Sequence, residues 1–186
     1  MEKQVILKRS LPSYLQSAKD NSCGPQVIRM VADFYKVDRG RKLVGEEWQQ
    51  VLLTTMKGNI ERSLGTMKKD LKKALGDLGL VAKELRGGDQ NRLAWIELAI
   101  RQGHPIIVTC RIPYRGKPVG HYVIIVGIDE DYFYIRDPFP YKGKKSKAYR
   151  RIPLKEFMKR RSGKGETVWG RLRWGIEVFP KKRESR

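Results

Sequence analysis

The chain has 186 residues, of which 40% are hydrophobic and two are cysteines. This length suits one domain, and the composition excludes a disordered chain and a disulfide-rich secreted scaffold. No apolar run reaches the roughly 18–20 residues of a membrane span, and the amino terminus lacks the apolar core of a secretion signal. We therefore expect a soluble cytoplasmic protein, with one domain over residues 1–180 and a basic tail over residues 181–186.

The net charge of +20 is distributed unevenly. Residues 142–186 carry 17 Lys or Arg residues against four acids, a net charge of +13. Clusters at Lys142–Lys147, Lys159–Lys164 and Lys181–Arg186 would attract nucleic acid, an anionic membrane or an acidic protein. The simpler interpretation is a solubilising or heat-adapted surface. No zinc-finger spacing or aromatic RNA-binding motif accompanies the charge, so polyanion binding through Lys142–Arg186 is a hypothesis without base specificity.

The first half of the chain is predicted to be mostly helical. After a short strand over residues 4–9, a helix begins at Cys23 and runs to about Lys36, with Asn21 or Ser22 as its cap. Its apolar residues recur at helical spacing. Further elements expected in this half are helices over residues 44–55, 67–78 (capped by Thr66) and 91–102, a strand over 80–85 and a turn at Gly87-Gly88.

The second half is predicted to form an antiparallel sheet. Strands are expected over residues 106–112, 121–128, 132–137 and 171–179, with a polar loop over 113–120 and a short helix over 154–161. The near-continuous apolar runs are typical of strands that are covered on both faces. The sequence therefore predicts an α+β fold with a helical lobe and a sheet lobe.

Cys23 stands where a polar loop becomes a helix. A thiol at a helix amino terminus is close to the positive end of the helix dipole and to unpaired backbone N–H groups, and both favour the thiolate. This position indicates a nucleophile. Cys110, at the end of an apolar run, is interpreted as a core residue; the alternative is a redox partner for Cys23, which would require the two to approach in space.

A cysteine nucleophile needs a base, and the chain has two histidines. His104 is interpreted as an exposed turn residue. His121 opens an apolar strand, and the next strand ends at Asp137. If Ile128 lies opposite Tyr132, His121 and Asp137 share a sheet face as diagonal neighbours, and a carboxylate there would orient the imidazole. This pairing requires an odd-length loop or a bulge at Asp129–Asp131.

Gln16 lies seven residues before Cys23. Acyl transfer through a thiol builds negative charge on the former carbonyl oxygen, which needs preplaced hydrogen-bond donors. The Gln16 amide and the Cys23 backbone N–H are candidates for this pair. The alternative for Gln16 is an ordinary polar loop residue.

The pattern Gln16, Asn21-Ser-Cys23-Gly-Pro25, Gly120-His121-Tyr122 and Asp137-Pro138 resembles the papain-like cysteine peptidases of the bacteriocin-processing, double-glycine-leader group. The similarity covers residues 10 to 140 in the family's order of Cys, His and Asp, and it is closer to the stand-alone relatives. The resemblance implies a papain-like fold with Cys23 as nucleophile, His121 as general base and acid, Asp137 as orienting group and Gln16 as oxyanion donor. Gln26 stands where the leader peptidases usually have a small residue.

The leading hypothesis is therefore a cysteine peptidase that acts on peptides or proteins through a thioester intermediate. Transfer of the acyl group to an amine would use the same residues, and a non-catalytic peptide-binding module would keep the same fold. No cofactor is expected, and no metal site, because two histidines and two cysteines show no ligand spacing.

Overall fold

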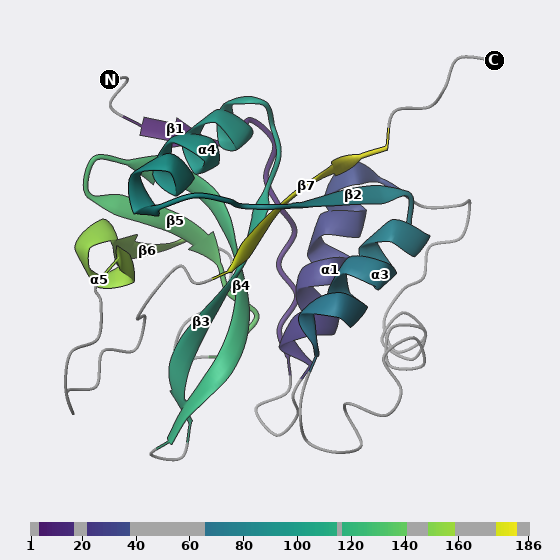
Figure 1. Cartoon of the computed structure of the whole chain (residues 1–186). Coiled ribbons are helices and arrows are strands. Elements are labelled where there is room, and N and C mark those ends of the chain that lie inside the picture. Colours follow the sequence, from purple (N-terminus) through teal and green to yellow (C-terminus); the bar gives the residue numbers. More distant parts are fainter. Residues whose placement is uncertain are drawn as a thin grey trace.

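The computed structural model describes residues 4–16, 22–37, 66–114, 117–140, 149–158 and 174–181 (Figure 1). The helices are α1 (Cys23–Tyr35), α3 (Lys68–Asp77), α4 (Asp89–Arg101) and α5 (Leu154–Met158). The strands are β1 (Gln4–Ile6), β2 (Leu80–Glu84), β3 (Ile106–Tyr114), β4 (Lys117–Asp129), β5 (Tyr132–Arg136), β6 (Arg150–Pro153) and β7 (Gly175–Pro180). The helix expected over residues 44–55 lies outside the described residues.

One seven-stranded sheet holds all of these strands in the order β2-β7-β3-β4-β5-β6, with β1 paired to β4. Every pairing is antiparallel. In Figure 1, α1 and α3 lie to the right of the long β3–β4 hairpin, α5 lies to its left, and α4 lies at the top of the view. The predicted α+β class, with a helical part and an antiparallel sheet, is confirmed.

The core forms where α1 packs against the middle of the sheet. Val27, Ile28, Met30 and Val31 of α1 are fully buried. So is the run 123–126 of β4, as expected for a strand covered on both faces. Burying one such aliphatic side chain is worth roughly 1.5–3 kcal/mol, so the contact between α1 and β4 is a major source of stability.

The hairpin of β3 and β4 corrects the prediction of a polar loop over residues 113–120. The two strands continue to Tyr114 and from Lys117, and Pro113 lies opposite Pro118. The prediction failed because it relied on the polar composition of this segment. The apolar residues of β3 and β4 set the register of the pairing, and the polar residues next to the turn continue the same ladder of hydrogen bonds. A charged strand, β6, was missed for a similar reason, since among its residues only Ile152 is buried.

Thr66 does not cap α3 as predicted; the N-cap residue is Met67. Thr66 instead packs against Gly24. A Cβ atom added to Gly24 would lie only 2.1 Å from the Thr66 Oγ1 atom. Several element ends also shift, because β1 ends at Ile6, α4 begins at Asp89 and β7 begins at Gly175. Such shifts of a few residues are usual for element boundaries.

Within the described residues, no helix is long and apolar enough to cross a membrane. Most of the basic clusters lie outside the described residues, so polyanion binding through Lys142–Arg186 stays a prediction.

Gly127 lets β1 approach β4 closely. A Cβ atom at Gly127 would lie 2.7 Å from Cγ1 of Ile6 and 2.9 Å from the carbonyl oxygen of Val5. We expect Gly127→Ala to lower the free energy of unfolding by about 1–3 kcal/mol, because the backbone of β1 must move. Urea unfolding followed by circular dichroism measures this change.

The matched control is Gly76→Ala in α3, where a Cβ atom would meet nothing within 4 Å. This change should stabilise the protein by up to about 1 kcal/mol through helix propensity. Equal effects of the two substitutions would contradict the close approach of β1 to β4.

Candidate active site

Cys23 is the first residue of α1 and is 8% exposed. Ser22 is the N-cap residue, as predicted, although its side chain makes no capping hydrogen bond. The start of α1 is tied to the sheet through Thr66, because Gly24 packs against Thr66 and Tyr122 of β4 donates a 2.9 Å hydrogen bond to the Thr66 carbonyl oxygen. The thiol is therefore held at the positive end of a thirteen-residue helix, beside β4.

His121 and Asp137 come together through an irregular pairing of β4 and β5. Ile128 lies opposite Phe133, so the predicted partner Tyr132 was wrong, and the irregularity lies between Ile125 and Gly127 rather than at Asp129–Asp131. Beyond this bulge the pairing has the register that was predicted for the site, with Ile124 opposite Arg136. The next residue, Asp137, then falls on the sheet face of His121.

The two side chains make a direct contact. The Nε2 atom of His121 lies 2.7 Å from the Oδ1 atom of Asp137, and the two side chains are only 2% and 5% exposed. Asp137 Oδ1 also accepts a 2.8 Å hydrogen bond from the Phe139 backbone N–H, and Arg150 Nη1 lies 3.7 Å from Oδ2. The Phe139 ring stands edge-on to the imidazole at 6.0 Å between centroids. The carboxylate is thus fixed, and it fixes the imidazole.

The charges at this place favour a protonated imidazole. Burial disfavours the charged form of His121, but its hydrogen bonds with Asp137 and Cys23, and their negative charges, outweigh burial and raise the pKa of His121 to about 9. The imidazole of His121 therefore lies between the Asp137 carboxylate and the Cys23 thiol. The arrangement of thiol, imidazole and carboxylate is able to perform nucleophilic catalysis.

Gln16 is buried, with 8% of its surface exposed. Its backbone N–H donates a 2.8 Å hydrogen bond to the carbonyl oxygen of Pro138, the residue after Asp137. The segment before Cys23 is therefore attached to the segment that carries Asp137. This contact brings Gln16 to the same part of the fold as the other three predicted site residues.

The other cysteine and histidine have structural surroundings. Cys110 is a core residue, as predicted, with 4% exposure, and its thiol donates a 3.6 Å hydrogen bond to the His121 carbonyl oxygen. Burial, and then the charges of Asp137 and Cys23, raise the pKa of Cys110. The interpretation of His104 as an exposed turn residue was wrong: its Nδ1 atom lies 2.6 Å from Glu177 Oε1, and its ring stacks on Phe179.

Sequence reasoning missed Thr66, Phe139 and Arg150 as neighbours of the site. Arg150 belongs to a run of basic residues, and Phe139 lies between two prolines, so neither carries a local signal of its role. Among the residues that the structure describes, no group of three or more His, Cys, Asp or Glu side chains is placed to hold a metal ion.

The model of the Peptidase_C39 like family matches residues 8–170. The chain belongs to this family. The match spans Cys23, His121 and Asp137, and it confirms the resemblance to the bacteriocin-processing peptidases and their relatives. No curated protein matches the chain.

Solved structures show that the family fold in this chain is papain-like. A protein described as a C39-like peptidase from Bacillus anthracis has a TM-score of 0.62 at 18% identity, covering 99% of this chain and 100% of the other. A Carica candamarcensis cysteine protease, CMS1MS2 in complex with E-64, has a TM-score of 0.62 at 16% identity, with the same coverage. A double glycine motif protease from an AMS/PCAT transporter, in complex with the leader peptide, has a TM-score of 0.50 at 22% identity, covering 83% of this chain and 89% of the other.

The pKa of His121 should depend on Asp137. In Asp137→Asn, we expect the pKa of His121 to fall from about 9 by roughly one unit or more. The neutral amide no longer stabilises the imidazolium, and burial of the ring still disfavours its charged form. The measurement is an NMR titration of the imidazole Cε1–H resonances, with His104→Gln used to assign the two signals.

Asp77→Asn is the matched control, because Asp77 pairs with Lys73 on α3 and makes no contact with His121. It should leave the His121 titration unchanged. An unchanged titration in Asp137→Asn as well would contradict the electrostatic role assigned to the 2.7 Å contact.

Proposed function

We propose that this protein is a cysteine peptidase that uses Cys23, His121 and Asp137 as its catalytic triad. The observation that carries the proposal is the buried 2.7 Å contact between His121 and Asp137, placed beside a cysteine at a helix amino terminus. Membership of the Peptidase_C39 like family and the papain-like neighbours support the same chemistry. The roles of the three groups follow from their positions.

In the first step, the Cys23 thiolate attacks the carbonyl carbon of a peptide bond and forms a carbon–sulfur bond. The electron pair of the carbonyl moves to oxygen, and the Gln16 side-chain amide and the Cys23 backbone N–H donate hydrogen bonds to that oxygen. Asp137 keeps the imidazolium of His121 oriented with Nε2 toward the carboxylate, which leaves Nδ1 for the thiol side.

In the second step, the carbon–nitrogen bond breaks and the electron pair leaves with the amine, which takes the proton of His121. A thioester remains on Cys23. His121, now neutral, removes a proton from water, and the resulting hydroxide attacks the thioester. Cleavage of the carbon–sulfur bond releases the carboxylate product and restores the thiolate and the imidazolium.

A peptide or protein is the substrate that we propose. One structural neighbour is a double glycine motif protease in complex with a leader peptide, and another is a cysteine protease in complex with E-64. Gln26, one helical turn beyond Cys23, is 1% exposed and differs from the small residue that is usual in leader peptidases. The proposal therefore does not include cleavage after a double glycine.

Labelling of the two cysteines tests the proposal. With a panel of peptidyl electrophiles at neutral pH, we expect the wild type and Cys110→Ala to be labelled rapidly at one site and to cleave peptides from a mixed library. Cys23→Ala should lose both labelling and cleavage. Intact mass spectrometry counts the adducts, and peptide sequencing identifies the cleaved bonds.

The chain has two cysteines, so each single substitution leaves one thiol whose labelling can be measured. Labelling that persists in Cys23→Ala and disappears in Cys110→Ala would assign the reactive thiol to Cys110 of β3 and contradict the proposal. Rapid labelling of Cys23 without cleavage would favour the peptide-binding module. Formation of an amide product when an amine is added would identify an acyltransferase.

The role of Gln16 has a test of its own. We expect Gln16→Ala to lower kcat by about 10²–10³-fold with a small change in KM, because the amide binds the oxyanion of the transition state and not the substrate carbonyl. Gln90→Ala, at an exposed position of α4, is the matched control and should leave both parameters unchanged. A wild-type kcat in Gln16→Ala would show that the amide is not an oxyanion donor.

A further inference from the structure

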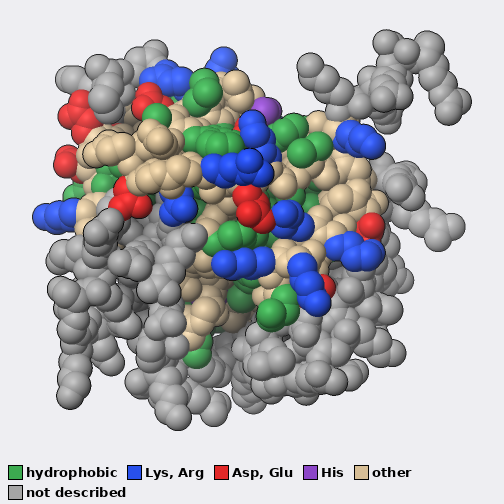
Figure 2. Space-filling view, in the orientation of Figure 1, with side chains coloured by type: hydrophobic (Ala, Val, Ile, Leu, Met, Phe, Trp, Pro, Cys, Tyr) green, Lys and Arg blue, Asp and Glu red, His purple; other side chains and the backbone are tan. Residues whose placement is uncertain are grey.

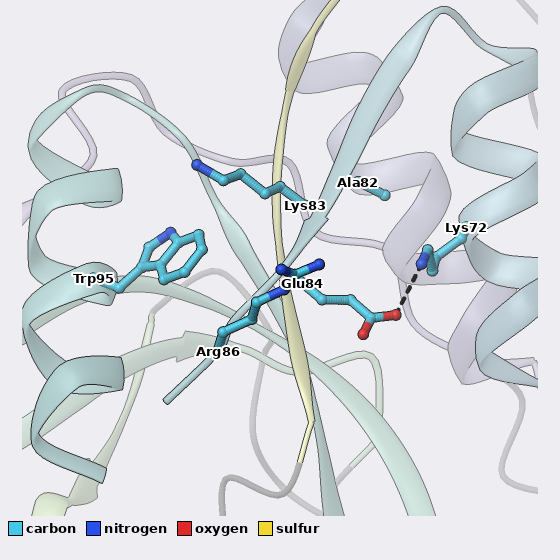
Figure 3. Close-up of a pocket in the computed structure, with 6 residues that line it drawn as sticks. All are labelled: Lys72, Ala82, Lys83, Glu84, Arg86 and Trp95. Atoms are coloured by element: carbon cyan, nitrogen blue, oxygen red, sulfur yellow. Dashed lines mark hydrogen bonds and ion pairs between the residues drawn. The ribbon is translucent and has the colours of Figure 1, made fainter. Parts of the chain in front are cut away.

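The outer edge of β2 lies in a charged pocket that is separate from the candidate active site. Lys72, Ala82, Lys83, Glu84, Arg86 and Trp95 line a cavity of about 410 Å³ (Figure 3). Strand β2 ends the sheet, and within the described residues its one partner strand is β7. In Figure 3, Trp95 on α4 and Lys72 on α3 stand on opposite sides of this edge. We call this place the β2 groove.

The backbone of β2 presents hydrogen-bonding groups to the β2 groove. Lys181 donates a 3.0 Å hydrogen bond to the Gly79 carbonyl oxygen, and Leu85 donates one of 2.9 Å to the Gly175 carbonyl oxygen. In an antiparallel ladder the residues that bond to the partner strand alternate with residues whose N–H and C=O groups point away from it. The odd-numbered residues of β2 therefore bond to β7. The residues whose backbone groups point away from β7 are Leu80, Ala82 and Glu84. Leu80 is buried, so Ala82 and Glu84 present their backbone groups to the β2 groove.

The charges of the β2 groove favour an acidic occupant. Lys72 Nζ lies 2.8 Å from Glu84 Oε1, so the one acid in the lining is already paired. Lys83 lies over the Trp95 ring, 4.7 Å from the ring centroid, and among the described residues neither Lys83 nor Arg86 forms a salt bridge. Besides the hydrogen bond with Lys72, the charge of Arg86 contributes to the lowered pKa of the Glu84 carboxyl. The two unbridged cations and Lys72 outnumber the single acid of the lining, which leaves the groove net positive. Figure 2 shows blue Lys and Arg side chains gathered around a red acidic side chain on this face.

Trp95 is fixed in place as one wall of the β2 groove. Its Nε1–H donates a 2.8 Å hydrogen bond to Glu177 Oε2, and Glu177 is 5% exposed and also contacts His104. Glu177 lies directly opposite Lys83 in the pairing of β2 with β7. A rigid aromatic wall next to a free strand edge provides a surface against which an apolar side chain of a ligand packs.

We propose that the β2 groove binds an extended acidic peptide segment, which adds to β2 as a further strand. Backbone groups of the ligand pair with Ala82 and Glu84, its acidic side chains meet Lys83 and Arg86, and Trp95 contacts a side chain between them. A second copy of this chain is disfavoured, because it would bring the same cations against each other on a chain of net charge +20. A nucleic acid would use the cations but not the backbone groups of the edge.

Peptide binding to the full chain carrying Cys23→Ala tests this site without cleavage of the probe. The probe is a fluorescein-labelled peptide with the sequence Glu-Val-Glu-Thr-Glu-Val-Glu-Thr, and fluorescence anisotropy measures its Kd. We expect Lys83→Glu combined with Arg86→Glu to weaken binding by about fivefold or more. Lys8→Glu combined with Lys155→Glu changes the net charge equally at exposed positions outside the groove and should leave Kd unchanged.

A proline separates strand addition from charge attraction. Ala82→Pro removes an N–H group that points to the open edge and keeps the hydrogen bonds of β2 with β7, so it should weaken binding by about fivefold while circular dichroism stays unchanged. N-methyl groups on alternate residues of the probe peptide remove its backbone donors. We expect this peptide to bind the unsubstituted groove about as weakly as the ordinary probe binds Ala82→Pro.

Three results would overturn the proposal. The first is no measurable binding of the probe, and the second is a Kd that the charge reversal at Lys83 and Arg86 leaves unchanged. The third is sensitivity to that charge reversal with no effect of Ala82→Pro or of N-methylation. In this last case, equal competition by a single-stranded oligonucleotide would identify the β2 groove as a general polyanion surface.

Discussion

The candidate active site depends on the register between β4 and β5. The bulge between Ile125 and Gly127 moves β5 by one residue relative to β4. Without this shift the side chain of Asp137 would point to the other face of the sheet, because side chains alternate along a strand. With it, the carboxylate meets His121 at 2.7 Å in a place where both side chains are buried. The raised pKa of His121 follows from its hydrogen bonds with Asp137 and Cys23 and from their negative charges.

The other half of the site depends on packing between the helices and the sheet. Cys23 gains its position because α1 is buried against β4, and because Gly24, Thr66 and Tyr122 connect the helix start to the strand. The hydrogen bond from the Gln16 N–H to the Pro138 carbonyl oxygen joins the segment before Cys23 to the segment after Asp137. Two segments more than a hundred residues apart in sequence therefore meet at one place. The proposed peptidase needs both parts, Cys23 at the start of α1 and the His121–Asp137 pair of the sheet.

The proposed peptide-binding edge uses the same sheet in a different way. At the candidate active site, β4 lies inside the sheet between β3 and β5, and its side chain His121 contributes to the site. At one end of the strand order, β2 is an edge whose backbone carries the proposed recognition, with Lys83 and Trp95 beside it. Edge strands with charged residues are protected from pairing with copies of themselves. The same charges select a partner of opposite sign, so protection and recognition follow from one set of residues.

The sequence by itself determined the helix that begins at Cys23, the apolar strands of the sheet and the identity of the candidate triad, because these depend on local periodicity and on residue types with few alternatives. It placed His121 and Asp137 on one face correctly while assigning the wrong position to the irregularity, since a bulge leaves little trace in residue order. Only the tertiary structure decided that His104 pairs with Glu177, that Thr66 supports Gly24 and that β3 and β4 continue through the polar segment. These contacts join residues distant in sequence, and their energy comes from burial and pairing that no local pattern encodes.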